Sequence, residues 1–355
     1  MEHGDLRIGI VGAGRIARER HLPGFRAIPG VRVVAVCNLR RESAIRVAHE
    51  FDIPKVHESW EHLVDDPEVD AVVIGTWPYL HCPITLAALD AGKHVLSQAR
   101  MAMNAREANR MLARAGECPS LTTMVVPSPY GLTGDAFLQR LVADGFLGTL
   151  REVHVRGLND ALADPATPLG WRQVARYSGF NMLALGILHE TAARWTPPVV
   201  RVLAHAAKLI PERTDPETGS RVRVGTPDSV RALTTQQDGS VGVYVLSGVT
   251  LHDAGMSVSL YGSSGTIVYD LARDAIHAAR AGEPDLKPLP TPDDLRGGWR
   301  VEAEFVAAIR GEGPVTRNDF ATAARSMQFT EAVARSSRHQ HPFDLPLREF
   351  SNPSL

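Results

Sequence analysis

The sequence contains only three cysteines among its 355 residues, Cys37, Cys82 and Cys118. Their number is odd and they lie far apart, so they form neither a disulfide framework nor the close spacing of a metal site. Such sparse use of cysteine fits a reducing compartment. We therefore expect a cytoplasmic protein with no bound metal.

The sequence also lacks long apolar runs and a strong net charge. No stretch approaches the ~18 apolar residues of a membrane-spanning helix, and the first residues, MEHGDLRIGIVGAG, do not resemble a signal peptide. The formal net charge of −2 leaves no basic field to attract nucleic acid. We expect a soluble protein that binds neither membranes nor nucleic acids and is long enough for two domains.

The first 120 residues alternate between strand and helix patterns. Near-continuous apolar stretches predict strands at 6–14, 31–39, 69–77, 93–97 and 121–127. Helices are predicted between them at 15–28, 41–52, 83–92 and 104–116. The last helix begins at Asn104, with Glu107 three residues later as in a capping box. This alternation predicts an α/β fold with a doubly wound parallel sheet.

The pattern changes after about residue 125. Alternating stretches predict strands of a mostly antiparallel sheet with one solvated face, at 150–157, 199–210, 229–237, 241–248 and 257–270. Two helices are predicted near 300–310 and 318–336. The segments that join the strands are rich in Asp, Pro and Gly. The longest of them, 157–179, is a candidate lid or binding loop.

A glycine motif stands at the first strand-to-helix turn. Gly12, Gly14 and Ala17 give the pattern G-x-G-x-x-A. The two glycines permit a tight turn and the close approach of a pyrophosphate, and the helix N-terminus supplies free N–H groups. The alternative is a glycine turn without a ligand. We predict a dinucleotide site that also includes Arg15 and Ile16 in the same turn.

The end of the second predicted strand bears on the choice of nucleotide. NAD enzymes place an acid there to bind the ribose 2′-hydroxyl. This chain instead has Asn38, followed by Arg40 and Arg41. Loss of the acid and gain of guanidinium groups favour a 2′-phosphate, and thus NADP, with NAD still possible. The alternative is that both arginines are solvated surface charges.

Four stretches together resemble the Gfo/Idh/MocA family of sugar and cyclitol oxidoreductases. They are residues 9–25, 61–96, 143–153 and 304–333, so the resemblance covers nearly the whole chain. It implies a Rossmann domain at 1–124 and, at 125–355, an α/β domain with an open, mostly antiparallel sheet. The resemblance also implies a homodimer or homotetramer packed through that sheet, and a small-molecule substrate.

The resemblance extends the predicted cofactor site. Trp77 and Pro78 stand where the family has Pro-Asn beside the nicotinamide half, and His81 keeps the family's place, with a structural role at the start of a helix as the alternative. The residues added to the site are Thr76, Trp77, His81 and Gln98.

The departures concern proton transfer. The family's Glu-Lys-Pro segment is here Gln98-Ala99-Arg100, so its lysine is absent. The family's Asp-x-Gly-x-His helix, aligned on its glycine, has Ala184 in place of the acid and Leu188 in place of the histidine. His189 comes one residue late, about 100° around a helix.

Other side chains are therefore candidates for catalysis. His189 is either the base or a helix residue packed on the sheet, and Arg100 is either an anion anchor or part of a structural ion pair. Asn181 is predicted to share the helix face of Ala184 and to orient a hydroxyl or carbonyl. Further candidates are Tyr177, Arg172 and Tyr130.

The loop 157–179 supplies the predicted substrate contacts. Trp171 and Arg172 are predicted to stack on the substrate and clamp it, the alternative being that Trp171 only pins the loop. Three functions remain open. They are an NADP(H)-dependent oxidoreductase of polyhydroxy rings, a redox-neutral lyase, hydratase or glycosidase that retains its nicotinamide, and a catalytically silent nucleotide-binding protein.

Overall fold

The computed structural model describes residues 5–127 and 131–350, which form two compact units. The first unit runs to Pro127 and includes Arg300–Ala324, and the second runs to Trp299 and resumes at Arg325. The predicted boundary after residue 124 lies near Pro127, but segment 300–324 belongs to the first unit rather than the second. The carbonyl of Asn318 accepts from Val125 N at 2.9 Å, which ties this segment to the edge of the first sheet.

The first unit contains a six-stranded sheet. Its strands are β1 (Leu6–Val11), β2 (Val31–Cys37), β3 (Lys55–Val56), β4 (Ala71–Ile74), β5 (His94–Ser97) and β6 (Thr123–Val125). All neighbours are parallel, in the order β3-β2-β1-β4-β5-β6. The central strands are apolar because both faces of the sheet are buried. The prediction of a doubly wound parallel sheet is confirmed.

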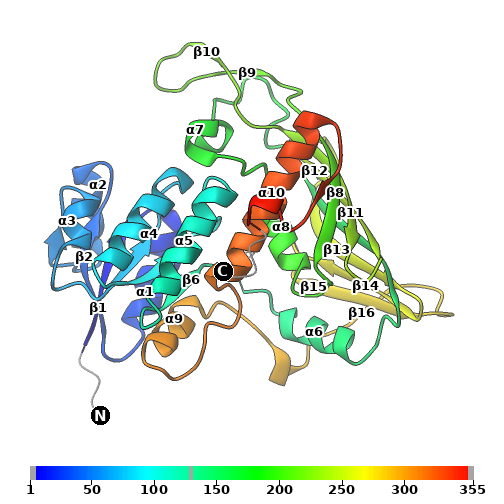
Figure 1. Cartoon of the computed structure of the whole chain (residues 1–355), viewed down its shortest axis with the longest axis horizontal. Coiled ribbons are helices and arrows are strands. Elements are labelled where there is room, and N and C mark those ends of the chain that lie inside the picture. Colours follow the sequence, from blue (N-terminus) through cyan, green and yellow to red (C-terminus); the bar gives the residue numbers. More distant parts are fainter. Residues whose placement is uncertain (1–4, 128–130, 351–355) are drawn as a thin grey trace. The chain divides into compact units, whose positions relative to one another are not determined.

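Helices surround this sheet (Figure 1). They are a π-helix (Ala17–His21), α1 (Leu22–Arg26), α2 (Arg41–Glu50), α3 (Trp60–Val64), a 3-10 turn (Pro78–Leu80), α4 (His81–Asp90), α5 (Ala105–Glu117) and α9 (Val301–Ile309). As predicted, Asn104 caps α5 by accepting from Glu107 N at 2.9 Å. The carboxylate of Glu107 in return accepts from Met103 N. Among the described residues, no helix is long and apolar enough to cross a bilayer.

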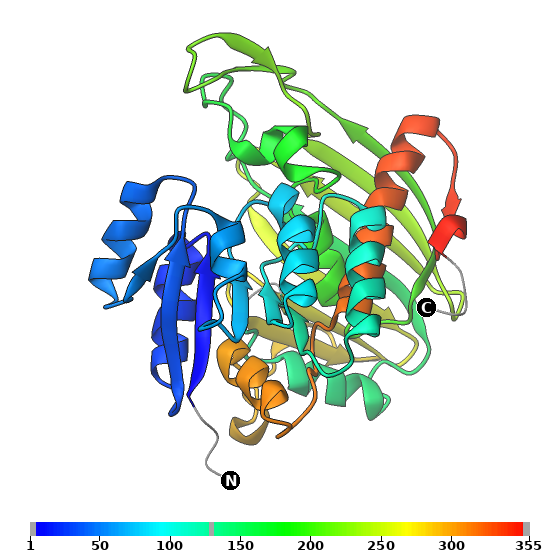
Figure 2. The same ribbon diagram turned by 60° about the vertical axis from the view of Figure 1, so that its left-hand side comes forward.

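The second unit contains a nine-stranded sheet in the order β16-β15-β14-β13-β7-β12-β11-β8-β17. Its strands are β7 (Leu150–Leu158), β8 (Val199–Ala207), β11 (Ser229–Gln236), β12 (Val241–Ser247), β13 (Gly255–Gly262), β14 (Gly265–Asp270), β15 (Ala275–Arg280), β16 (Lys287–Pro288) and β17 (Phe343–Asp344). Only β7 and β12 pair in parallel, which confirms a mostly antiparallel sheet. A separate hairpin, β9 (Glu212–Thr214) and β10 (Arg221–Arg223), extends beyond the sheet (Figure 2).

Helices cover one face of this sheet. The helices of the second unit are α6 (Asp135–Ala143), a 3-10 turn (Trp171–Gln173), α7 (Ala175–Ser178), α8 (Leu185–Ala192) and most of α10 (Phe320–His339). Short turns at Asp293–Leu295 and Arg348–Phe350 complete it. Ser336 of α10 accepts from Ala204 N of β8 at 2.9 Å, and Leu188 of α8 packs on Gly157 of β7.

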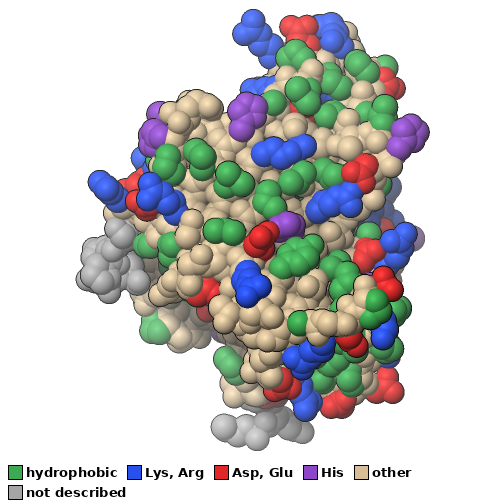
Figure 3. All heavy atoms as spheres, turned by 90° about the vertical axis from the view of Figure 1, so that its right-hand side faces the viewer, with side chains coloured by type: hydrophobic (Ala, Val, Ile, Leu, Met, Phe, Trp, Pro, Cys, Tyr) green, Lys and Arg blue, Asp and Glu red, His purple; other side chains and the backbone are tan. Residues whose placement is uncertain are grey.

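The opposite face of the sheet is open. Side chains on it alternate with buried ones along each strand, as β8 and β11 demonstrate. Leu203, Leu233 and Val241 remain 43, 59 and 50 % exposed there. Figure 3 shows this side of the molecule, with hydrophobic side chains scattered among charged ones.

Candidate nucleotide site and the predicted catalytic residues

The glycine turn after β1 packs closely against the backbone of Gly75 and Thr76, which follow β4. Gly12 has φ of +87°, a region that favours glycine. A Cβ at Gly12 would lie 2.7 Å from Gly75 C and Thr76 N, and a Cβ at Gly75 would lie 2.3 Å from Gly12 O. The glycines at these two positions are thus required by the fold itself, at the carboxyl ends of β1 and β4.

Gly14 differs from Gly12. Its backbone does not have a positive φ, and a Cβ added there would meet nothing within 4 Å. The fold therefore has no need of glycine at this position, and open space lies beside it. A β-carbon would occupy the space through which a pyrophosphate reaches the backbone N–H groups. The residues of this turn fit a dinucleotide.

Asn38 stabilises the turn from β2. Its Oδ1 accepts from Ala13 N at 2.7 Å, and its Nδ2 donates to Ser43 Oγ at 3.0 Å. Both ends of the amide thus have partners within the protein. Asn38 orders the glycine turn and carries no negative charge that would repel a phosphate.

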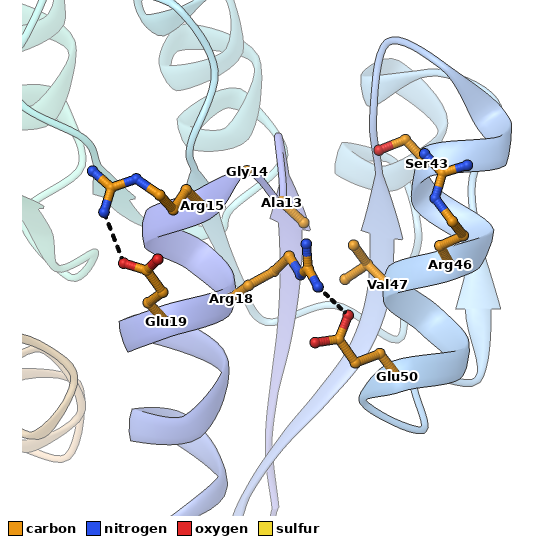
Figure 4. A pocket seen from close by; sticks show the side chains of 9 residues that line it. All are labelled: Ala13, Gly14, Arg15, Arg18, Glu19, Ser43, Arg46, Val47 and Glu50. Carbon is orange, nitrogen blue, oxygen red and sulfur yellow. Dashed lines mark hydrogen bonds and ion pairs between the residues drawn. The ribbon is translucent and has the colours of Figure 1, made fainter.

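An open cavity of about 670 Å³ adjoins the glycine turn (Figure 4). Arg15 and Arg18 line it from the first helix, and Arg46 lines it from α2. Arg15 pairs with Glu19 at 2.9 Å, and Arg18 reaches across to Glu50 at 2.6 Å. The remaining lining residues are Ala13, Gly14, Ser43 and Val47. Three guanidinium groups and two carboxylates leave the cavity with a small positive charge.

Arg40 and Arg41 precede Ser43 and Arg46 in the sequence, but unlike those two residues they do not line the cavity. Both are exposed, Arg40 as the residue that precedes α2 and Arg41 as its first residue. Neither makes an ion pair with a described side chain, so both guanidinium groups are available in solution. Ile16 is half-buried at the start of the first helix. Arg40 and Arg41 were predicted from the sequence, whereas Arg18, Ser43 and Arg46 were not, because their positions depend on how the two helices pack.

Thr76, Trp77 and His81 form the connection from β4 into α4. Trp77 is 38 % exposed, whereas His81 is buried. The His81 ring lies between two carbonyls, with Nε2 2.9 Å from Thr76 O and Nδ1 3.0 Å from Arg100 O. Burial lowers the pKa of His81, so the ring is neutral near pH 7 and donates to one carbonyl at a time. The ring thus links the loop after β4 to the loop after β5. This geometry agrees with a structural role for His81 at the start of a helix, the alternative to a role in cofactor binding.

The segment Gln98-Ala99-Arg100 follows β5. Gln98 N donates to Ile74 O at 2.9 Å, and the Gln98 side chain is buried against His21. The peptide bond between Ala99 and Arg100 is cis. Arg100 is only 9 % exposed. Ala99, predicted from the sequence to stand in place of the family's lysine, is thus a small side chain flanked by two buried polar ones.

The loop 157–179 of the second unit is fixed by a residue that the sequence did not identify. Arg213 of β9 is completely buried and donates to the carbonyls of Asp164 and Thr167 at 2.9 Å. In this loop Arg172 is exposed and Trp171 is half-buried, with the guanidinium 4.3 Å from the centre of the indole ring. The two predicted substrate contacts are therefore neighbours on an ordered loop.

Tyr177 and Asn181 differ in exposure. Tyr177 is partly exposed on α7, and the Arg176 guanidinium lies 4.8 Å from its ring centre. Asn181 is buried and donates to Ser178 O at 2.6 Å. The prediction that Asn181 shares a helix face with Ala184 is wrong, because Leu183 has φ of +48° and α8 begins only after Ala184. Tyr130, another candidate, lies outside the described residues.

His189 lies inside the second unit. Its ring stacks on Phe329 with centroids 3.6 Å apart, and Nδ1 lies 3.0 Å from the Tyr244 hydroxyl. Burial lowers the pKa of His189 to about 3. Such an imidazole is a weak base, and this geometry favours the packing alternative over the catalytic one.

A buried neutral histidine makes stability depend on pH. The pKa of His189 is lower in the folded state than the ordinary 6.5, so the unfolded chain binds more protons below about pH 6.5. This contribution is fully present above that pH and is lost as the pH falls toward 3. At pH 5 the loss should be about 2 kcal/mol. Glutamine does not titrate, so we expect the His189→Gln variant to lack this loss of unfolding free energy.

Urea unfolding at pH 7 and pH 5 measures this difference. The quantity compared is the change in unfolding free energy of each protein between the two pH values, so that other titrating groups cancel. Equal changes in wild type and His189→Gln would show that His189 is not held neutral.

Comparisons with known proteins agree with this architecture. Residues 6–124 match the oxidoreductase family with an NAD-binding Rossmann fold, and residues 136–268 match the GFO/IDH/MocA C-terminal domain. Levoglucosan dehydrogenase from Pseudarthrobacter phenanthrenivorans is 25% identical, over 79% of this chain and 77% of its own length. Myo-inositol 2-dehydrogenase from Thermotoga maritima is 24% identical, over 76% of each chain.

A solved structure shares the fold over almost the entire length. Levoglucosan dehydrogenase in complex with NADH and L-sorbose has a TM-score of 0.83 at 20% identity, and the match covers 97% of this chain and all of the other. The parallel sheet with its glycine turn and the mixed sheet of the second unit correspond to the two matched domains. This chain therefore belongs to the Gfo/Idh/MocA family of oxidoreductases, with an NAD-binding Rossmann domain at its N-terminal end.

Proposed function

We propose that the protein is an NADP(H)-dependent oxidoreductase acting on a sugar, cyclitol or related polyhydroxy ring. The observation that carries this proposal is the glycine turn, in which Gly14 leaves open space beside the start of the first helix and a cavity with three arginines. The names of the relatives, levoglucosan dehydrogenase and myo-inositol 2-dehydrogenase, support a polyhydroxy ring as the substrate.

Three features support NADP over NAD. Asn38 is neutral and both ends of its side-chain amide are engaged, so it offers no acid to the ribose. Arg40 and Arg41 are exposed directly after it, and Arg46 lines the adjoining cavity. Guanidinium groups bind phosphate with charge-assisted, often bidentate hydrogen bonds. The related levoglucosan dehydrogenase was solved in complex with NADH. The preference for NADP is therefore proposed for this chain from its own residues and not from that relative.

The bound nucleotide would exchange a hydride with a ring carbon of the substrate. The protein's own task is to bind the ring and to move the hydroxyl proton. We assign proton transfer to Tyr177, the partly exposed ionisable group among the catalytic candidates of the second unit. Trp171 and Arg172 supply an apolar surface and a cation for the ring. Arg100 does not titrate usefully and serves to bind an anionic or polar group.

Titration of the nucleotides tests the cofactor preference. We expect NADP⁺ to bind more tightly than NAD⁺ when both are measured by calorimetry. The double variant Arg40→Ala/Arg41→Ala should weaken NADP⁺ binding about 10- to 100-fold and leave NAD⁺ binding nearly unchanged, because a hydrogen bond to a charged group contributes ~1.5–3 kcal/mol.

Arg32→Ala is the control, since it removes a guanidinium group from the opposite end of β2. It should leave the affinity for both nucleotides unchanged. Tighter binding of NAD⁺ to the wild type would overturn the assignment of NADP.

Turnover assays separate the three open functions. The wild-type protein is incubated with NADP⁺ and levoglucosan or myo-inositol, and both product and reduced nicotinamide are measured. Formation of both in equal amounts supports the oxidoreductase. Product without net reduction would indicate the redox-neutral reaction. Tight nucleotide binding without turnover of any polyhydroxy ring would indicate the silent protein.

We further infer that a second copy of the chain covers the open sheet face. Arg201, Leu203 and Leu233 line a shallow hollow of about 530 Å³ on it, next to Glu152 and His154. Exposed apolar side chains between charges of both signs suit a self-complementary interface. This supports a homodimer or homotetramer.

A further inference from the structure

Three polar side chains form a buried row in the first unit. Glu302 of α9 is 3 % exposed, His21 of the π-helix is 0 % exposed, and Gln98 after β5 is 8 % exposed. Glu302 Oε1 lies 2.5 Å from His21 Nδ1, and His21 Nε2 lies 2.5 Å from Gln98 Nε2. The row thus runs from a carboxylate, through an imidazole, to an amide at the carboxyl end of β5.

The fold makes specific room for this row. A Cβ on Gly24 of α1 would lie 2.7 Å from Glu302 Oε2 and 2.9 Å from its Cγ, so glycine there accommodates the carboxylate. Glycine within a helix costs ~1 kcal/mol relative to alanine. The π-helix that carries His21 ends where Leu22 N bonds to Ala17 O, just before Pro23, which has no N–H. Such π-helical turns are rare and occur frequently at functional sites.

The order of the three groups fixes their hydrogen-bond direction. An ionised carboxylate only accepts, so Nδ1 of His21 carries the proton toward Glu302. With the proton on Nδ1, Nε2 is then the acceptor of the ring. The amide nitrogen of Gln98 faces it and donates. The remaining polar atom of Gln98, Oε1, can only accept a hydrogen bond.

We propose that Glu302 and His21 are positioning residues that hold the Gln98 amide with Oε1 presented to a hydroxyl group of the bound nucleotide. This inference rests on the proposed nucleotide binding. Ligands of doubly wound sheets bind at the carboxyl ends of the strands, where Gln98 lies. The negative charge of the row resides on Glu302, on the far side of the imidazole, and a neutral acceptor faces the nucleotide.

Glu302→Gln tests the positioning role. Without a carboxylate that only accepts, either ring nitrogen of His21 can carry the proton. The side-chain amide of Gln98 can then rotate so that its oxygen and nitrogen exchange places. In ¹⁵N NMR spectra of the full chain, with His21→Gln to assign the ring, the wild type should show a protonated Nδ1 and an unprotonated Nε2. Glu302→Gln should show mixed tautomers and bind NADP⁺ about tenfold more weakly.

Glu304→Gln is the matched control. Glu304 lies on the same helix and accepts from Thr316 Oγ1 at 2.8 Å, away from His21. The control should keep both the wild-type tautomer and the wild-type affinity. Gln98→Leu removes the acceptor while leaving the pair intact, so it should weaken NADP⁺ binding about tenfold without changing the His21 tautomer. It also keeps the inference testable if Glu302→Gln fails to fold.

Two results would overturn the inference. One is a wild-type His21 protonated on Nε2 or on both nitrogens. The other is unchanged affinity for NADP⁺ in Gln98→Leu. Failure of the proposed function is distinct from both, because the wild type would then bind no nucleotide, whatever the tautomer of His21.

Discussion

Replacement of Gly14 by alanine is expected to abolish nucleotide binding without unfolding the protein. The added Cβ meets nothing within 4 Å in the folded chain, so it costs the fold nothing. It does occupy the space through which a pyrophosphate approaches the N-terminus of the first helix. We expect the affinity for NADP⁺ to fall at least ~100-fold, and alanine should be tolerated structurally at this exposed position.

Gly12→Ala provides the contrast within the same motif. Its φ of +87° and the 2.7 Å approach to the backbone of Gly75 and Thr76 make any side chain costly to the fold. A loss of about 2 kcal/mol or more is expected, together with a melting temperature lower by several degrees. Calorimetric titration and thermal unfolding of the two variants provide the comparison. If Gly14→Ala bound NADP⁺ as tightly as the wild type, the turn would not be the pyrophosphate site.

Replacement of Tyr177 by phenylalanine is expected to lower kcat about 10²-fold while the affinity for NADP⁺ stays the same. The variant removes only the hydroxyl, and loss of a general base or acid typically costs 10²–10⁴ in rate. Phenylalanine keeps the ring beneath the Arg176 guanidinium, so the loop should remain folded. Steady-state kinetics on the substrate found in the turnover assays, with calorimetry for the nucleotide, measure both quantities.

His189→Gln is the control for this experiment. A histidine whose pKa lies near 3 and whose ring stacks on Phe329 should not set the rate near neutral pH. We expect this variant to retain kcat within a few-fold of the wild type. A large loss of kcat in His189→Gln, together with an unchanged kcat in Tyr177→Phe, would identify His189 as the base instead of Tyr177.

These predictions follow from the departures that the sequence predicts at the family's two proton-transfer positions. Ala99 is predicted to stand in place of the lysine, and Leu188, which is completely buried, in place of the histidine. A group elsewhere must therefore move the proton if the protein is a dehydrogenase. The loop held by Arg213 carries the candidates, because it combines the Tyr177 phenol with a half-buried indole and an exposed guanidinium.

The sequence by itself determined the parallel α/β architecture of residues 6–125 and their glycine turn, although β3 and α3 were not predicted. Short-range patterns carry this information: apolar strands buried on both faces, helix starts such as Asn104, and glycines whose roles depend on the local backbone. The strands of the second unit were also predictable wherever buried and exposed residues alternate, as in β11 and β12. Strand β15 also alternates but was not predicted, and the short strands β9, β10, β16 and β17 lack a periodic signal and were not predicted either.

Only the tertiary structure decided how side chains from distant segments meet. His21 and Glu302 are 281 residues apart and still form a buried pair, because α9 returns to the first unit. His189 carried the right chemistry for a base, but Tyr244 and Phe329, from β12 and α10, enclose its ring and keep it neutral. A residue's identity gives its chemistry, but burial and partners fix its protonation state, and these depend on contacts that no local pattern records.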